Sequence, residues 1–384
     1  MKRKLCIFLA VMLAATVFVG CGDKEESASS GSSSIVEHIS PDDMPKPAAS
    51  AKEPEPVAEP EPEPAKGKEV PEGMYLSELT GEPIAEELRN QRPIAVMVDN
   101  ESIALPHFGT AEADVVYEMM NSTANDRITR LMMMVKDWGA IEQMGSIRST
   151  RPTNILLAAE WNAVLCHDGG PYHNDVYFQK PWTDHFSGTF GRVNNGKSRE
   201  FTEYILTGDL DRNFSNSRYT REYNDYYTLG DKPHFNFAEW GLEVNLSDVY
   251  DGVSSATNIS LPFKHNKSQL KYNSGTGTYD YYEYGEVHKD GEDGETLTFK
   301  NVLLQCCDFN QLDANGYMIY NCIAMVQPGY YITNGEAKLI YWSKSSECEP
   351  TKFYDENNEE IEINTGKTYI GLVPSDSWGQ VTLN

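Results

Sequence analysis

The stretch from Gly145 to Pro152, Gly-Ser-Ile-Arg-Ser-Thr-Arg-Pro, contains the residue types and spacing best suited to a functional site. Arg148 and Arg151 lie three residues apart, directly before an apolar run that predicts a helix over 152–160. Proline is favoured in the first helical turn, where a missing N–H costs no intrahelical bond. Backbone N–H groups at a helix start attract anions, and guanidinium groups match carboxylate or phosphate oxygens. The pattern therefore predicts an anion-binding surface, and it does not indicate which reaction, if any, the protein catalyses.

The overall charge of the chain makes this arginine-rich segment unusual. Acidic residues number 58 against 32 lysines and arginines, so the formal net charge is −26. Arg127, Arg130, Arg148 and Arg151 nevertheless fall in one segment that contains only two acidic residues. So acidic a chain is a poor partner for nucleic acid, and we expect none. Pairing of these arginines with acids elsewhere in the fold is the alternative to a ligand.

Further polar groups follow two apolar runs that read as buried strands. Asp99 and Asn100 follow the run 93–98, and His167-Asp168-Gly169-Gly170 follows the run 161–166. If these strands are parallel, both groups emerge at one carboxyl edge, where ligands of open α/β sheets bind. The expected ligand-binding residues are Arg148, Arg151, Arg130, Asp99, Asn100, Glu118, His167, Asp168, Gly169 and Gly170.

Two alternatives to a binding surface also involve His167. A cell-wall hydrolase or transferase would use His167 as a base, with Asp99 or Asp168 orienting it. No Gly-x-Ser-x-Gly motif supplies a nucleophile, so no catalytic residue is assigned. A metal site from His167, Asp168, His173 and Asp175 lacks the spacing of a metal-binding helix, so neither a metal nor a cofactor is expected.

The first residues of the chain predict where in the cell the protein is located. Lys2, Arg3 and Lys4 precede an apolar stretch that is too short to span a membrane, which is typical of a signal peptide over 1–20. Phe18-Val19-Gly20-Cys21 resembles a bacterial lipobox, so we expect acyl chains such as palmitate on Cys21. Residues 21–73 are rich in Ser, Pro and Glu and predict a disordered spacer.

The folded part is expected to comprise two domains. Strands are predicted at 93–98, 114–120, 128–135 and 161–166, with helices at 152–160 and 197–207. Gly208 would end the second helix, and Met132-Met133-Met134 would lie in a strand core. This alternation predicts an α/β (or α+β) domain over 74–245.

Beyond residue 245 the pattern changes to short aromatic and β-branched runs separated by turn pairs. Asn315-Gly316 is expected to join the runs 301–308 and 317–326, and Asn334-Gly335 to join 330–333 and 337–342. A mostly antiparallel β domain over 246–384 follows from these hairpin signals. Its cysteines have no CxxC spacing, and either a bridge from Cys306 or Cys307 to Cys322 or free thiols would fit.

Several of these segments occur together, in an order that resembles one known family. They are Arg92–Asn100, Ala113–Glu118, Ile128–Arg130, Gly145–Pro152, His167–Gly170, Asn301-Val302, Trp342-Ser343-Lys344, Gly366-Lys367-Thr368 and Leu372-Val373-Pro374. In this order they resemble the YerB-like lipoprotein family of Gram-positive bacteria, over residues 85–375. The resemblance implies an envelope lipoprotein with an α/β part and a β part, of unknown function and without a catalytic assignment.

Two functional hypotheses follow. The preferred one is a non-catalytic lipoprotein, anchored through Cys21 at the extracellular face of the cell membrane. It would bind an anionic wall component, such as a peptidoglycan stem carboxylate or a wall-polymer phosphate, or a wall-assembly protein. The alternative is the His167-dependent wall hydrolase or transferase.

Overall fold

The computed structural model describes residues 66–228, 230 and 232–384. The predicted signal peptide at 1–20, Cys21 and the spacer as far as residue 65 lie outside the described residues. Within the described part, no helix has the length and apolar character needed to cross a membrane. The last residues of the predicted spacer contact the folded part, because the backbone N–H of Lys68 donates to the Trp240 carbonyl over 2.6 Å.

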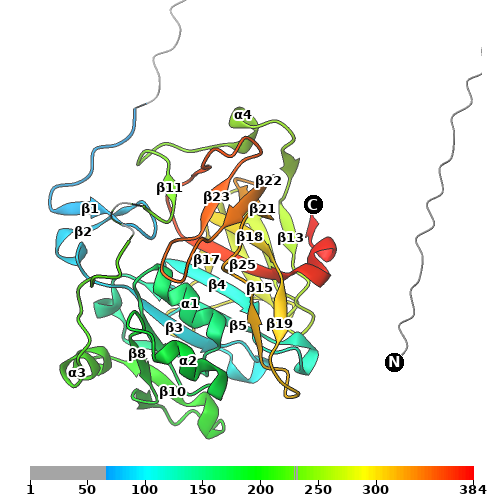
Figure 1. Cartoon of the computed structure of the whole chain (residues 1–384). Coiled ribbons are helices and arrows are strands. Elements are labelled where there is room, and N and C mark those ends of the chain that lie inside the picture. Colours follow the sequence, from blue (N-terminus) through cyan, green and yellow to red (C-terminus); the bar gives the residue numbers. More distant parts are fainter. Residues whose placement is uncertain (1–65, 229, 231) are drawn as a thin grey trace, which may run out of the picture. The chain divides into compact units, whose positions relative to one another are not determined.

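One large mixed sheet of 11 strands forms the centre of the fold (Figure 1). Its strands, in spatial order, are β12 (Ser254–Ser255), β22 (Glu336–Ser343), β21 (Gln327–Thr333), β18 (Asn301–Cys307), β25 (Thr368–Pro374), β4 (Val115–Met120), β5 (Thr129–Val135), β3 (Ile94–Asp99), β7 (Val164–His167) and β8 (His185–Ser187), with β23 (Lys352–Tyr354) paired to β22. The pairs β18–β25, β25–β4, β3–β7 and β7–β8 are parallel, and the other pairs are antiparallel.

The strands β3, β4 and β5 are buried along their whole length. Successive side chains in a strand point to opposite faces, so a continuous apolar run suits a sheet that is covered on both faces. Met132 and Met134 join the core on one face, and Met133 joins the core on the other. The predicted strands at 93–98, 114–120 and 128–135 are confirmed, as is the core position of the three methionines.

Helix α1 (Pro152–Glu160) covers one face of the sheet and is buried at every residue. It begins at a proline and occupies the residues predicted for it, so this prediction is confirmed. The strand after it was expected from residue 161 but begins at Val164. The shift arises because the N–H groups of Trp161 and Asn162 still bond to carbonyls of the last helical turn.

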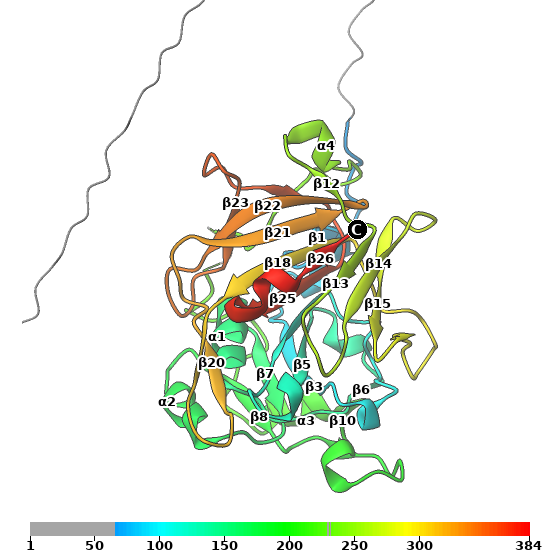
Figure 2. The same ribbon diagram turned by 90° about the vertical axis from the view of Figure 1, so that its right-hand side faces the viewer.

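A second, antiparallel sheet covers much of the other face (Figure 2). Its strands are β16 (Glu286–Val287), β15 (Thr278–Glu283), β14 (Gln269–Asn273), β13 (Asn258–Ser260) and β26 (Thr382–Leu383), with β17 (Thr298–Phe299) paired to β15. Tyr279 and Tyr281 on the buried side of β15 pack into the same core as Val116 and Tyr369 of the main sheet.

The helix predicted over 197–207 is wrong. A short 3-10 helix at Arg199–Phe201 is followed by β10 (Glu203–Leu206), which lies between β6 (Gln143–Gly145) and β9 (Gly191–Arg192). Partners distant in sequence satisfy the backbone of β10, so strand pairing overrides the helical spacing of the apolar residues. Gly208, at φ 81°, precedes α3 (Asp209–Ser215) and does not end a helix.

Both C-terminal turn pairs form hairpins, but one of them joins a different strand from the one expected. Asn334 and Gly335, at φ 50° and 80°, connect β21 to β22 in a tight antiparallel hairpin. The pair Asn315-Gly316 joins β19 (Phe309–Gln311) to β20 (Met318–Tyr320), because β18 pairs with β21 and β25 and not with the run 317–326. The cysteines of the described part, Cys166, Cys306, Cys307, Cys322 and Cys348, are free thiols.

The remaining elements are short connections at the rim of the two sheets. They are β1 (Met74–Leu76) with β2 (Pro83–Ala85), β11 (Asn236–Phe237) with β24 (Glu362–Ile363), α2 (Asp175–Phe178), α4 (Leu246–Val249), and 3-10 helices at Glu86–Leu88, Ser102–Ala104, Asn125–Arg127, Trp138–Ala140, Tyr172–Asn174 and Ser375–Gln380.

The fold is dominated by strands, with helices mainly in the N-terminal part and a strand-rich C-terminal part. The division predicted near residue 245 crosses the main sheet, because β4 from one side of it pairs with β25 from the other. Their register runs from Val115 opposite Thr368 to Met119 opposite Leu372. Each side of the predicted boundary therefore supplies the neighbouring strand that the other needs.

We expect neither fragment 74–245 nor fragment 246–384 to fold cooperatively when expressed alone. Each would expose a buried, apolar strand edge that lacks its hydrogen-bond partner. Residues 66–384 serve as the control and should give a single cooperative melting transition by circular dichroism. A sharp thermal transition of the isolated 74–245 fragment would contradict this expectation and support two independent domains.

Candidate functional site

Asp99, the last residue of β3, lies at the centre of the predicted arginine cluster. Its Oδ2 accepts from Nε of Arg148 at 2.6 Å and from Nη2 of Arg130 at 3.3 Å. Its Oδ1 accepts the backbone N–H of Glu101 at 2.8 Å. Burial alone would raise the pKa of Asp99, but Arg130, the Glu101 N–H and Arg148 outweigh it and lower the pKa. The structure thus brings Asp99, Arg130 and Arg148 together as predicted.

Both of these arginines already have carboxylate partners. Arg148 also donates to Oε2 of Glu200 at 2.8 Å, and its guanidinium lies 5.3 Å from the Phe201 ring. Arg130 is buried and donates in addition to the Ser149 carbonyl at 2.8 Å. Two guanidinium charges therefore meet the carboxylates of Asp99 and Glu200. This geometry favours a structural role for Arg130 and Arg148 over contact with a ligand.

Arg151 differs from the other two arginines, because no carboxylate of the described residues pairs with it. It directly precedes α1, is only 8% exposed, and donates to the carbonyls of Asn121 at 3.1 Å and Thr150 at 2.9 Å. Its guanidinium lies 4.8 Å from the Tyr317 ring. Burial, reinforced by the charge of Arg130, lowers the pKa of Arg151 to about 9, so it is still protonated at neutral pH.

Asn100 and Glu118 belong to a buried hydrogen-bond network between the two sheets. Asn100 donates to Oγ1 of Thr129 at 2.9 Å. The carboxylate of Glu118 accepts from Thr129 Oγ1 at 2.7 Å, Ser268 Oγ at 2.6 Å, Tyr369 Oη at 2.7 Å and Tyr281 Oη at 3.0 Å. Burial raises the pKa of Glu118 against the effect of these donors. Because protein donors surround this carboxylate, its position suits packing better than ligand contact.

The groups that follow β7 do not form a catalytic pair. His167 places Nδ1 2.8 Å from the Gly169 carbonyl and Nε2 3.0 Å from Nδ1 of His185. Asp168 instead pairs with Arg192 at 2.9 Å. Burial lowers the pKa of His167 to about 4, although the Gly169 carbonyl opposes this. With both ring nitrogens engaged and no carboxylate bonded to either, His167 lacks the oriented partner that a general base needs.

The glycines of this motif contact protein groups. The N–H of Gly169 donates to Ser187 Oγ at 3.1 Å, and the Gly169 carbonyl accepts from the backbone of Thr150 at 3.2 Å. The motif therefore lies against the backbone that leads into α1. The parallel pairing of β3 with β7 brings it to the same sheet edge as Asp99, as expected.

The alternative metal ligands are not brought together. His173 pairs with Asp313 at 3.1 Å, whereas His167 and Asp168 have the partners described above. Among the described residues, the one group with metal-ligand spacing comprises His107, Glu283 and His288. None of these three belonged to the predicted site.

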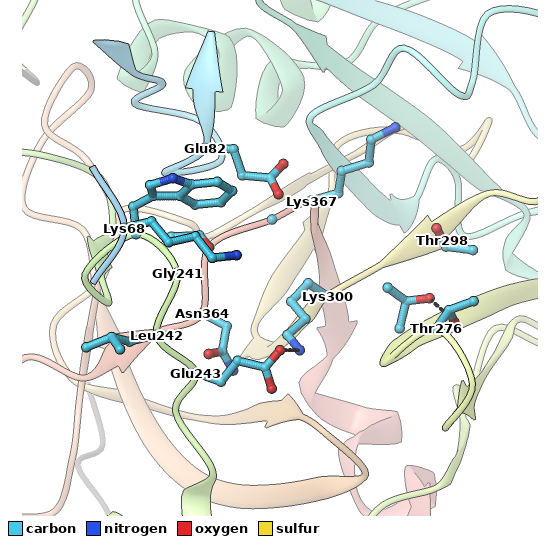
Figure 3. A pocket seen from close by; sticks show the side chains of 14 residues that line it. Lys68, Glu82, Gly241, Leu242, Glu243, Thr276, Thr298, Lys300, Asn364 and Lys367 are labelled. Atoms are coloured by element: carbon cyan, nitrogen blue, oxygen red, sulfur yellow. Dashed lines mark hydrogen bonds and ion pairs between the residues drawn. The ribbon is translucent and has the colours of Figure 1, made fainter. Parts of the chain in front are cut away.

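A cavity of about 380 Å³ provides a concave surface that the sequence reasoning missed (Figure 3). Its walls come from several distant segments of the chain: Lys68, Glu82, Trp240, Gly241, Leu242, Glu243, Thr276, Thr278, Thr298, Lys300, Asn364, Thr365, Gly366 and Lys367. We call it the lysine cavity. Gly366 and Lys367 belong to a motif that carried the family resemblance, but nothing in the sequence pointed to a cavity, because its residues share no local pattern.

The three lysines of this cavity are held in different ways. Lys300 pairs with Glu243 at 3.1 Å and donates to Oδ1 of Asn334 at 2.8 Å. Lys367 donates to a backbone carbonyl and has no carboxylate partner among the described residues. The ammonium of Lys68 lies 5.6 Å from the half-exposed Trp240 ring and points toward the middle of the cavity in Figure 3.

Gly366 and Glu82, a glutamate whose pKa is raised, also line the cavity. Gly366 lies at φ 129°, and a Cβ there would come within 2.8 Å of the Lys300 side chain. A larger residue would therefore displace Lys300. Burial raises the pKa of Glu82, while nearby Lys367 opposes the shift. The lining thus includes three lysines, two glutamates, threonine hydroxyls and an indole face in an otherwise acidic chain, although the Lys367 ammonium bonds to a backbone carbonyl and points away from those of Lys68 and Lys300 in Figure 3.

Comparison with known proteins places this architecture among relatives. Two family models match: "Protein of unknown function (DUF3048) N-terminal domain" over residues 79–220 and "Protein of unknown function (DUF3048) C-terminal domain" over residues 259–370. A Bacillus subtilis (strain 168) protein described as "Putative lipoprotein YerB" is 31% identical over 91 residues, which are 24% of this chain and 26% of that relative. The sequence match thus spans about a quarter of the relative's length.

A solved structure extends the likeness to most of the chain. The crystal structure of YerB protein from Bacillus subtilis matches with a TM-score of 0.67, covering 81% of this chain and 99% of that chain. The two sequences are 18% identical over the superposition, so this match shows a shared fold.

We predict that Arg130→Met lowers the free energy of unfolding by about 3–5 kcal/mol at pH 7, because it leaves the buried Asp99 carboxylate short of a partner. Arg127→Met is the matched control, since Arg127 pairs with Asp376 near the surface and should cost at most about 1 kcal/mol. Urea unfolding curves measure both. A loss under 1 kcal/mol for Arg130→Met would contradict the structural role.

The same pair of variants yields a pH test. Because the folded pKa of Asp99 is lowered, its stabilisation is complete above the unfolded pKa of about 3.9 and is lost as pH falls through the lower folded value. The stability difference between wild type and Arg130→Met should therefore be constant from pH 7 to pH 5 and shrink below about pH 4. A difference that grows on acidification would refute this assignment.

Proposed function

Since the chain belongs to the DUF3048 family of proteins of unknown function, we propose that it is a lipid-anchored envelope protein that binds an anionic cell-wall component without catalysing a reaction. Two lines support the proposal: the predicted signal peptide over 1–20, which is followed directly by Cys21, and the likeness to a protein named as a lipoprotein. We place the folded part at the extracellular face, held there by the spacer. The partner is a component of the wall or a protein that assembles it.

The lysine cavity is the observation that carries the binding proposal. Ligand pockets typically enclose about 300–1,000 Å³ and combine an apolar surface with a few convergent polar groups. The lysine cavity encloses about 380 Å³ and gathers Lys68, Lys300 and Lys367 in a chain of net charge −26. The positive charge of the cavity attracts anions, whereas the negative charge on the rest of the molecule repels them. We therefore expect an anion that fits the cavity to bind there and not elsewhere on the surface.

The lining also indicates the kind of anion. The Trp240 ring offers a flat apolar face, and Thr276, Thr298 and Asn364 offer hydrogen-bonding groups. This combination suits a saccharide or peptide that carries a carboxylate or phosphate. We therefore propose a peptidoglycan stem carboxylate or a wall-polymer phosphate as the ligand group.

The arginine-rich segment has a smaller part in this proposal than the sequence implied. Arg148 and Arg130 share Asp99, so their charges are largely compensated. Arg151 has no carboxylate partner in the part of the chain that the structure describes, and it is the member of the segment that we propose for a second anion contact. We do not retain the hydrolase alternative, because His167 bonds to Gly169 and His185 and neither Asp99 nor Asp168 bonds to it.

We predict that the mature chain, with the lipid omitted, binds muropeptides with free stem carboxylates or glycerol-phosphate polymer fragments, as measured by titration calorimetry at low salt. Lys68→Gln and Lys300→Gln should each weaken binding about tenfold or more, since a hydrogen bond to a charged group contributes about 1.5–3 kcal/mol. Melting curves check that each variant is folded.

Lys180→Gln is the charge-matched control, because Lys180 pairs with Glu347 away from the cavity lining. It should bind as the wild type does. Equal losses in all three variants would indicate unspecific charge attraction. Absence of binding to both classes of probe would remove the lysine cavity as the anion site.

The anchoring part of the proposal has its own test. Cys21→Ala should abolish labelling by a fatty-acid probe and release the protein from the membrane fraction, because the signal peptide would be removed without an acyl chain in its place. Cys348→Ala, a change at a free thiol of the folded part, is the control and should leave labelling unchanged. Continued labelling of the Cys21→Ala protein would exclude this attachment point.

A further inference from the structure

His107, Glu283 and His288 form a buried cluster outside the lysine cavity. One atom of each residue that can bind a metal lies within 4.8 Å of the corresponding atoms of the other two. The side chains are almost fully enclosed, with exposed fractions of 0%, 2% and 3%. Two imidazoles and a carboxylate at this spacing form a ligand set that the chemistry of the wall-binding proposal does not use.

The cluster is poorly satisfied by hydrogen bonds. A single bond joins its members, between Nδ1 of His288 and Oε1 of Glu283 at 2.7 Å. Among the described residues, none is a hydrogen-bond partner of either ring nitrogen of His107, of Nε2 of His288 or of Oε2 of Glu283. These are four of the twelve buried side-chain atoms in that condition within the described part of the chain. Buried polar atoms nearly always have partners, so this concentration points to a missing ligand.

Strand geometry explains why Glu283 and His288 face one another. Tyr279, Tyr281 and Glu283 alternate onto the buried side of β15. The β15–β16 hairpin places Tyr282 opposite Val287, and the backbone N–H of His288 donates to Tyr281 at 2.8 Å. Glu283 and His288 are therefore diagonal neighbours on the same face of the hairpin. A glutamate at a core position of an alternating strand is the sequence signal that could have revealed the cluster.

The segment that carries His107 is fixed against this hairpin from the other side. Its carbonyl accepts the N–H of Gly291 at 2.7 Å. Three residues on, Thr110 donates its Oγ1 to the carboxylate of Asp290 at 2.9 Å, and the N–H of Ala111 donates to the same oxygen at 3.1 Å. These bonds hold the His107 ring 5.1 Å from the His288 ring, so the cluster is positioned before any ligand arrives.

We propose that His107, Glu283 and His288 bind a divalent transition metal ion, with Zn²⁺ as the best match. Two histidines and one glutamate are a known ligand set of zinc, whereas Mg²⁺ and Ca²⁺ prefer oxygen ligands. Tetrahedral ligands about 2.0–2.1 Å from zinc lie about 3.3 Å apart, so small side-chain rotations bring these atoms onto one ion.

Three protein ligands leave a fourth coordination position. Glu283 and His288 also line a cavity of about 310 Å³, together with Leu105, Pro106, Glu286, Val287 and Lys289. A water molecule or an anionic group of a ligand can reach the ion from this cavity. The ion would also strengthen the existing attachment of the segment around His107 to the second sheet.

The experiment is a metal titration of the mature chain without its lipid, after removal of metal with a chelator. Co²⁺ should give the visible absorption bands of a low-symmetry nitrogen–oxygen site, and Zn²⁺ should displace it at one ion per chain. Zn²⁺ should also raise the melting temperature, and the chelator should reverse the rise. Failure to bind either ion more tightly than micromolar would overturn the proposal.

Variants locate the site. Glu283→Gln and His107→Gln should weaken Zn²⁺ binding by more than about a hundredfold, since even loss of an outer-shell partner costs ten- to a hundredfold. His185→Gln is the matched control, because His185 also belongs to a close histidine pair, with His167 at 3.0 Å. It should bind Zn²⁺ as the wild type does. Unchanged affinity in both cluster variants, or a loss only in His185→Gln, would overturn the assignment.

A crystallographic readout keeps the test decisive if a variant does not fold. Crystals of the wild type soaked with Zn²⁺ should show anomalous scattering at the zinc absorption edge within about 2.0–2.2 Å of His107, Glu283 and His288. A zinc peak elsewhere, with none at this cluster, would refute the site directly.

Discussion

The pairing of β4 with β25 is the contact on which both parts of the fold depend. The two strands lie far apart in the sequence and run parallel in the middle of the main sheet, from Val115 beside Thr368 to Met119 beside Leu372. Parallel strands cannot be joined by a tight turn, and most of the folded chain lies between these two strands in the sequence. Because strands at the centre of a sheet are buried on both faces, the pair also explains why the sequence here is apolar at nearly every position.

Two buried carboxylates lie near this strand pair, one on each face of the sheet. Each is tolerated because residues on its own face supply its hydrogen-bond and charge partners. On the face toward the second sheet, Glu118 accepts bonds from Tyr281 and Tyr369. On the helical face, Glu160 at the end of α1 pairs with Lys344 at 2.9 Å, and Lys344, with His234, lowers the pKa of Glu160 despite its burial. Isolated carboxylates would be costly at such depth, so these networks specify which distant segments must meet.

The surfaces best suited to bind a ligand also form where distant segments of the chain meet. The lysine cavity combines Lys68, near the start of the folded part, with Lys300 and Lys367, which directly precede β18 and β25 of the main sheet. The histidine cluster combines His107 with a hairpin of the second sheet. Ligand sites often form at such junctions, because facing elements leave a concave space between them. By contrast, two of the arginines that are close together in sequence, Arg130 and Arg148, pair with Asp99.

The sequence alone determined the features that depend on short-range patterns: the buried central strands, helix α1 with Pro152 at its start, and the Asn334-Gly335 hairpin. It also placed Arg148, Arg130 and Asp99 in one site, although Arg130 reaches Asp99 through the antiparallel pairing of β5 with β3 and not through parallel strand ends. Only the tertiary structure decided that residues 203–206 form a strand, because their partners are distant in the chain. It also decided that Arg148 has a carboxylate on each side, while lysines from separate segments share a cavity. A side chain's type and spacing define what it can bind, but its charge is free for a ligand only where folding leaves it unpaired, and that depends on long-range contacts.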